Sequence, residues 1–224
     1  MLLRELTMVE VILRILAAVL MGGIIGLERG MNNHSAGLRT YMLVCVGSCL
    51  LMMTNQYMFQ VFGTGDPARM GAQVVSGIGF LGAGTIMVTR HNQIKGLTTA
   101  AGLWAAAGVG LALGIGFYEA AVMGALAIFV ILTLLHRWDD HMLKNAKVLP
   151  VYVELSMDVP LSEFLHQLRK MDVDFSDIQM EQGQTIDEDV RAFIATLHVK
   201  QRINHGLLMS KMRKIDGVVY LEDL

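Results

Sequence analysis

The chain has 224 residues, of which 54% are hydrophobic, and its mean hydropathy of +0.49 is high for a soluble domain. Residues 1–147 carry 10 of the 18 Lys and Arg but only 7 of the 20 Asp and Glu. Residues 148–224 therefore carry 8 Lys and Arg and 13 Asp and Glu. This distribution argues against a chain that is soluble throughout. It predicts a membrane domain over residues 1–147 and a small acidic soluble domain over residues 148–224.

Five apolar segments in the first domain predict five transmembrane helices, since about 20 apolar residues cross ~30 Å of hydrocarbon. The segments are residues 8–27, 40–59, 70–89, 97–114 and 119–137. We expect the first to be a retained span and not a cleaved signal peptide, because Glu10 and Arg14 interrupt its apolar start.

The basic residues of the short connections predict the orientation of these spans. With five spans, residues 28–39, residues 90–95 and the stretch after the fifth span all fall on one side, and each of them carries Lys or Arg. Because short basic connections stay in the cytoplasm, the amino terminus is expected outside and the carboxyl-terminal domain in the cytosol.

The second domain shows a different pattern, with short segments that alternate between strand and helix character. Residues 150–157, 173–182, 190–199 and 217–223 favour strands, and residues 161–171 and 204–215 favour helices. The order β-α-β-β-α-β is that of a ferredoxin-like α+β fold. Its core is small, so docking or dimerisation would help to stabilise it.

The run VSGIGFLGAGTI at residues 75–86 contains G-x-G-x-x-G at Gly77, Gly79 and Gly82, the pattern of a dinucleotide-binding turn. Such a turn needs an acidic residue about 20 positions later to hold the ribose. No Asp or Glu occurs between Asp66 and Glu119, and residues 70–89 carry no charge. Nucleotide binding is therefore not expected.

Four motifs in register resemble the MgtC/SapB family of bacterial inner-membrane proteins. They are GGIIGLERG (22–30), AGLRT (36–40), DPARMGAQVVSGIGFLGAGTI (66–86) and GLTTAAGLWAAAGVGLALGIG (96–116). The resemblance covers residues 10–140, and the tail looks like the ACT-like cytosolic domain of longer members. It implies a role in adaptation to low magnesium or acid stress, and some members are thought to restrain the F-type ATP synthase.

The glycines have two interpretations. In lipid, small residues let helix backbones approach closely, which predicts a tightly packed bundle. Alternatively, the glycine density near Gln73 and Ser76 permits a broken third helix that lines a polar cavity. The glycines expected to pack are Gly22, Gly26, Gly77, Gly79, Gly82, Gly84, Gly108 and Gly110.

Charged residues at the ends of the spans are the candidate site residues. Glu10 and Arg14, one turn apart, are either a pair at the membrane interface or an intramembrane ionisable site. Asp66 before Pro67 is also an ordinary helix start. The resemblance implies a functional role for Glu28, Arg29, Arg39, Asp66, Arg69, Gln73 and Ser76.

Neither a metal site nor an enzyme is expected. Glu10, Glu28, Asp66 and Glu119 lie on both sides of the predicted topology and cannot converge on one Mg²⁺, and the histidines show no paired-ligand spacing. We therefore expect no cofactor, a non-enzymatic modulator of another membrane system, and as the alternative a small ion or solute transporter. The expected partners are the lipid bilayer, a membrane protein such as the F-type ATP synthase, and a second copy through the cytosolic domain, with no nucleic acid.

Overall fold

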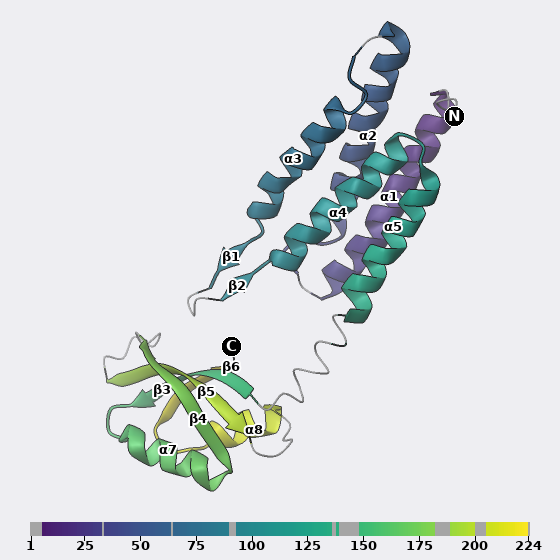
Figure 1. The fold of residues 1–224 in the computed structure, drawn as a ribbon. Coiled ribbons are helices and arrows are strands. Elements are labelled where there is room, and N and C mark those ends of the chain that lie inside the picture. Colours follow the sequence, from purple (N-terminus) through teal and green to yellow (C-terminus); the bar gives the residue numbers. More distant parts are fainter. Residues whose placement is uncertain are drawn as a thin grey trace. The chain divides into compact units, whose positions relative to one another are not determined.

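The computed structural model describes residues 6–32, 34–63, 65–89, 93–135, 138, 148–181, 189–199 and 205–223. The chain forms two compact units, Met1–His136 and Arg137–Leu224. The first unit is a bundle of helices with one short hairpin, and the second contains a four-stranded sheet with two helices (Figure 1).

Four helices of the described chain are long and apolar enough to cross a membrane. They are α1 (Met8–Met31), α2 (Leu38–Phe62), α4 (Leu97–Gly114) and α5 (Tyr118–Val130), which continues into the π-helical turn η1 (Ile131–Leu135). Each lies within a few residues of a segment predicted from hydropathy. In Figure 1, α1 and α5 run in one direction and α2 and α4 in the opposite one, so that α1 begins at one end of the bundle and α5 finishes at the other.

The predicted fifth span, at residues 70–89, is not confirmed. Helix α3 (Arg69–Ala83) has 15 residues, which rise about 22 Å and fall short of the ~30 Å hydrocarbon layer. The apolar run continues beyond Ala83, but the helix ends at Gly84. The β-branched stretch that follows forms strand β1 (Met87–Val88), which pairs with β2 (Ile94–Lys95) in an antiparallel hairpin.

Small buried residues form the centre of the bundle, and large apolar residues cover its outside. Ala18, Cys45 and Cys49 are fully buried, and both cysteines are free thiols. Leu20 and Leu43, by contrast, are 64% and 73% exposed. Apolar side chains exposed along whole helices are costly in water and suit contact with lipid.

The second unit has the element order β-α-β-β-α-β. Its elements are β3 (Val148–Ser156), α7 (Leu161–Lys170), β4 (Val173–Glu181), β5 (Val190–Val199), α8 (His205–Met212) and β6 (Val218–Asp223). The strands are all antiparallel in the order β4-β5-β3-β6.

The core of this unit follows from the period-two alternation of its strands. Val151, Val153 and Leu155 of β3 share a fully buried cluster with Phe164 of α7 and Phe193 of β5. The two phenylalanine rings meet edge-on with their centroids 6.0 Å apart, a favoured aromatic geometry. The unit therefore has a hydrophobic core of its own.

Candidate functional site

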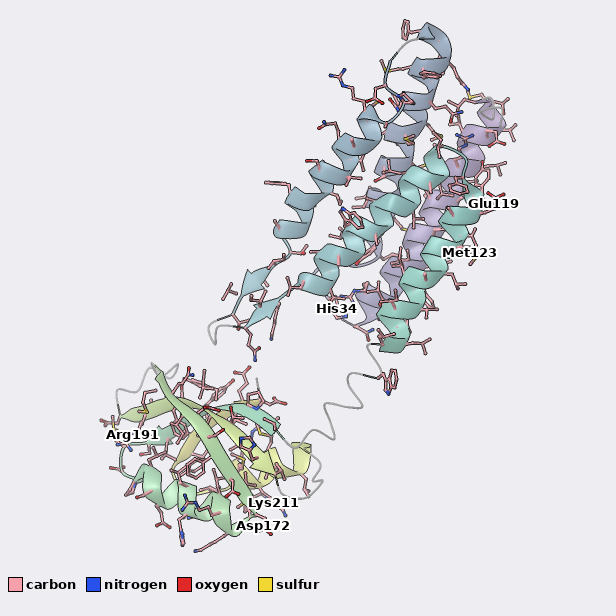
Figure 2. The ribbon with its side chains drawn as sticks, viewed as in Figure 1. His34, Glu119, Met123, Asp172, Arg191 and Lys211 are labelled. Carbon is pink, nitrogen blue, oxygen red and sulfur yellow. The ribbon has the colours of Figure 1, made fainter. Side chains whose placement is uncertain are left out.

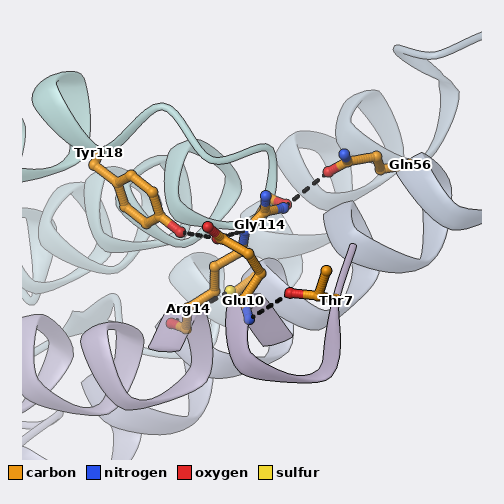
Figure 3. A network of polar contacts seen from close by, with 7 residues as sticks. Thr7, Glu10, Arg14, Gln56, Gly114 and Tyr118 are labelled. Carbon is orange, nitrogen blue, oxygen red and sulfur yellow. Dashed lines mark hydrogen bonds and ion pairs between the residues drawn. The ribbon is translucent and has the colours of Figure 1, made fainter. Parts of the chain in front are cut away.

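The strongest polar feature of the bundle is Arg14 of α1, whose side chain is 0% exposed. Its Nε lies 3.4 Å from Oε2 of Glu10, one helical turn earlier. Its Nη1 donates hydrogen bonds to Oε1 of Gln56 at 2.8 Å and to the carbonyl oxygen of Gly114 at 2.7 Å. Tyr118 donates to Oε2 of Glu10 at 2.5 Å. We call these five residues the Arg14 cluster (Figure 3).

The Arg14 cluster joins α1, α2, α4 and α5 through one guanidinium. Gly114 is the last residue of α4, so its carbonyl has no partner within the helix and lies at the negative end of the helix dipole. A buried cation needs such partners, because its desolvation costs several kcal/mol if they are missing. Arg14 therefore holds four helices together at this end of the bundle.

Local sequence positions both members of the Arg14–Glu10 pair. Thr7 caps α1 by accepting a hydrogen bond from the Glu10 backbone N–H at 3.3 Å (Figure 3), which fixes the first turn. At Gly116 the backbone has φ +81°, and a Cβ there would lie 2.9 Å from Nη2 of Arg14. Nη2 itself has no hydrogen-bond partner in the part of the chain that the structure describes. Glycine at position 116 thus provides both the turn and the space beside the guanidinium.

A second buried arginine, Arg29, lies near the other end of α1 and is 2% exposed. Its Nη2 donates to Oγ1 of Thr99 in the first turn of α4 at 3.2 Å. The fully buried Tyr41 of α2 interacts electrostatically with both Arg29 and Glu28. We call these four residues the Arg29 cluster.

The Arg29 cluster retains unused hydrogen-bonding capacity. Nε of Arg29, Oε2 of Glu28 and the Tyr41 hydroxyl are buried atoms without a hydrogen-bond partner among the described residues. The other oxygen of Glu28 accepts from Asn32 at 2.8 Å. Buried polar atoms in proteins are nearly always hydrogen-bonded, so three such atoms together mark a place where water or another small polar group can bind.

The other residues for which the family resemblance implies a functional role lie apart from these clusters. Arg39, Asp66, Arg69, Gln73 and Ser76 are all exposed. Asp66 accepts a hydrogen bond from the backbone of Ala68 at 2.9 Å just before α3, which fits a role in starting that helix. Arg39 stays on the surface and does not join Glu28 and Arg29.

Acidic residues do not converge in the bundle. Glu119 and Met123 lie on the exposed side of α5, and Glu119 does not join the Arg14 cluster (Figure 2). Within the described ranges, no three His, Cys, Asp or Glu side chains come together as metal ligands.

The glycines that support close helix contact lie mainly between α1, α2 and α4. A Cβ on Gly22 or Gly26 would lie 2.8 Å from the backbone of α2, and one on Gly110 would overlap the carbonyl oxygen of Cys45. A Cβ on Gly102 would overlap the Tyr41 hydroxyl, so this glycine makes room for the phenol. Close contact here requires residues without a side chain.

The glycines of α3 differ from the packing expectation. At Gly77 and Gly79, as at Gly108 of α4, a Cβ would meet no described atom within 4 Å. Gly82 reaches only ordinary contact with Ala100 at 3.4 Å, and Gly84 contacts the carbonyls of its own helix. The alternative of a break within the glycine run also differs from the structure, since α3 is continuous to Ala83 and its glycines have no positive φ.

A groove of about 680 Å³ lies between α2 and α3. Its walls are mainly apolar and include Leu43, Leu51, Ile78 and Leu81. Gln73 lines it, whereas Ser76 is not among its lining residues. The groove is thus not the polar cavity that was considered for this part of the chain.

Several polar residues of the bundle were not foreseen as site residues. Gln56 belongs to the Arg14 cluster, and the buried Asn55 donates to the carbonyl of Pro67. Both are polar residues within an apolar segment, and this feature of the sequence could have identified them as candidate site residues. The sequence T-x-x-E at Thr7–Glu10 is also a recognisable start of a helix.

The chain matches one family model and several known proteins. The profile of the MgtC family matches residues 15–141. The chain is 34% identical over 215 residues to the Escherichia coli K12 protein named "Putative magnesium transporter YhiD", covering 93% of this chain and 97% of that protein. It is 33% identical over 221 residues to "Protein SapB" of Bacillus subtilis, covering 94% and 93%.

A third relative matches over a shorter stretch. The chain is 41% identical over 131 residues to "Protein MgtC" of Salmonella typhimurium LT2, covering 58% of this chain and 54% of that protein. No solved structure matches the chain significantly.

Proposed function

The chain belongs to the MgtC family, and on that premise we propose that it is a non-enzymatic protein of the bacterial inner membrane that modulates another membrane system. The process it serves is adaptation to low magnesium or acid stress. The names of two relatives, MgtC and a putative magnesium transporter, support a role in magnesium homeostasis. The exposed apolar surface of four long helices supports the membrane location.

The observation that carries the modulator function is how the bundle uses its charges. Arg14 donates to Gln56 and Gly114 on neighbouring helices and pairs with Glu10 on its own helix, so it connects helices of the bundle. Glu10 and Glu28 are 18 positions apart on α1, which places them about 27 Å from each other. Mg²⁺ takes its ligands from one or two carboxylates together with several waters. The separation of Glu10 and Glu28 therefore favours structural roles for both residues over joint binding of one cation along a transport path.

The Arg29 cluster is the part of the bundle best suited to act on a partner. It combines a cation, a carboxylate and a phenol with unused hydrogen-bonding capacity. By the distribution of Lys and Arg, this end of the bundle faces the cytosol. The F-type ATP synthase is the membrane-protein partner that the family suggests. The second unit, with its ACT-like element order, is proposed as a cytosolic docking or dimerisation domain.

Affinity purification from mild detergent, followed by mass spectrometry, tests this function. We expect a defined membrane complex to co-purify with the wild-type chain and to be lost in Arg29→Gln, although this variant still accumulates in the membrane. Glu119→Gln, which changes an exposed charge on α5, is the matched control and should retain the complex. Recovery of the same proteins with wild type and Arg29→Gln would contradict a role of the Arg29 cluster in partner binding.

A second candidate function, a small transporter, is favoured by the printed name of the Escherichia coli relative. It does not need a broken third helix, because the orphan polar atoms of the Arg29 cluster offer a polar site within the bundle. Mg²⁺ uptake by proteoliposomes that contain only the purified chain separates the two functions. Uptake above that of empty liposomes, and its loss in Arg29→Gln, would replace the modulator by the transporter.

A further inference from the structure

We propose that the groove between α2 and α3 binds one anionic phospholipid, with an acyl chain between the helices and its phosphate on Arg39. The groove runs along α2 from Arg39 and Thr40 to Leu51, and along α3 from Leu81 back to Met70. The basic residue therefore lies at one end of a mainly apolar channel. This arrangement of charge and apolar surface is complementary to an anionic lipid, which carries its charge at the head of a long apolar tail.

The length of the groove matches one leaflet of a bilayer. The 12 residue steps from Arg39 to Leu51 correspond to about 18 Å along the helix axis, and half of the hydrocarbon layer is about 15 Å. A tail that starts at the height of Arg39 would thus reach the bilayer centre beside Leu51. Leu43, which is 73% exposed, and Leu51, which is 44% exposed, provide apolar surface along this path.

The groove between α2 and α3 has a volume of about 680 Å³. Glycines supply the space on both walls, because Cβ atoms on Gly47 of α2 and Gly77 of α3 would meet no described atom within 4 Å. A single flexible chain fits such a channel. This also gives the unpacked Gly77 a physical role.

Arg39 is available to bind a phosphate. Its side chain is exposed, and it forms no hydrogen bond or ion pair with the residues that the structure describes. None of the described residues that line the groove is acidic. Arg39 also lies in the first turn of the 25-residue helix α2, which lacks a side-chain cap, so the helix dipole favours an anion at the same place. Thr40 adds a hydroxyl next to the guanidinium.

Native mass spectrometry of the full-length chain tests this site. The protein is reconstituted with equal amounts of phosphatidylglycerol and phosphatidylethanolamine, extracted in mild detergent and examined for retained lipid. We expect retention of one phosphatidylglycerol in preference to phosphatidylethanolamine. Arg39→Gln should reduce this preference about fivefold, since one basic side chain near anionic lipid contributes about 1 kcal/mol. Arg39→Lys should restore most of it.

Variants that fill the groove test the position of the tail. Gly47→Leu and Gly77→Leu, made separately, should each reduce the retention of both lipids, and thermal unfolding identifies a variant that is merely misfolded. Lys95→Gln, which removes an exposed charge on β2 outside the groove, should leave the lipid preference unchanged. Equal retention of the two lipids by wild type, an unchanged preference in Arg39→Gln, or a protein segment that displaces lipid from the groove would overturn the proposal.

Discussion

Two buried arginines on the same helix show that burial alone does not define the role of a charge. Arg14 and Arg29 are 0% and 2% exposed. Arg14 contacts a carboxylate, a side-chain amide and a helix-terminal carbonyl, whereas Arg29 donates to the hydroxyl of Thr99 and interacts with Tyr41. The first arginine connects four helices, and the second leaves neighbouring polar atoms unpaired. The number of partners, and not the burial, distinguishes a structural tie from a place where something can bind.

The same substitution at both positions sharpens this comparison, and the larger effect is expected at Arg14. Arg14→Gln removes the counter-charge of Glu10 and leaves the Gly114 carbonyl without its donor. We expect this to destabilise the bundle by about 2 kcal/mol, because the partly buried carboxylate of Glu10 and the Gly114 carbonyl both lose a charged donor. Thermal unfolding of the purified protein in detergent measures the loss, and immunoblots of membranes should show reduced accumulation.

The double variant Glu10→Gln/Arg14→Gln is the control for this prediction. Removing both charges leaves no uncompensated carboxylate, so the double variant should be more stable than Arg14→Gln alone. If Arg14→Gln unfolded at the wild-type temperature, the description of Arg14 as a structural tie would be wrong.

A second comparison, between two glycines, concerns packing. Gly110→Ala should cost about 2 kcal/mol, since the new methyl group would press on the Cys45 carbonyl and on Cβ of Ser48 at 2.8 Å. Gly79→Ala meets open space and should stay within about 1 kcal/mol of wild type, because alanine also has the higher helix propensity. Thermal unfolding in detergent measures both. Equal losses at the two positions would show that α3 is packed against something that the single chain lacks.

Arg29→Gln should have a small effect on stability and a large one on function. It removes one hydrogen bond to Thr99, a loss of about 1 kcal/mol, and it relieves the desolvation of a cation that has few partners. Growth of a complemented deletion strain under magnesium limitation, read beside immunoblots, should show normal accumulation with impaired growth. Thr99→Val, which keeps the cation and removes its acceptor, should have a milder growth defect. Loss of protein in step with loss of growth would make Arg29 a structural residue like Arg14.

The sequence was sufficient for contacts that follow from local periodicity. The helical spans appear as apolar segments, the elements of the second unit appear from their periods, and Glu10 and Arg14 are one turn apart on any helix. The predicted length of α3 was wrong because hydropathy does not distinguish a helix from a strand. The residues after Gly84 are apolar in either structure.

The remaining partners depend on tertiary structure. Gln56 is 42 residues and Gly114 is 100 residues from Arg14 in the chain, and a backbone carbonyl carries no sequence signal. Likewise, glycine composition indicated that helices pack closely but not which glycines do so. Only the arrangement of the helices separates Gly110 from Gly79.

The smallest expected effect concerns a tyrosine–glutamate pair that is the exposed counterpart of Tyr118 and Glu10. In β6, Tyr220 donates to Oε2 of Glu222 at 3.2 Å, with the hydroxyl on the surface of the second unit. The negative charge of Glu222, followed by the hydrogen bond to it, raises the pKa of Tyr220 above its ordinary value. Glu222→Gln should therefore lower the Tyr220 pKa, as measured by phenolate absorbance with Tyr220→Phe as the reference.

The sign of the linked effect on stability follows from that direction. A raised folded-state pKa means that the pair contributes stability below the unfolded tyrosine pKa of about 10 and loses it as pH rises through the folded value. Because Tyr220 is exposed, solvent screens the interaction and the change in stability should be close to the detection limit. Unfolding of wild type and Glu222→Gln should thus coincide at neutral pH. A marked destabilisation of the variant there would mean that this surface pair is covered in the protein.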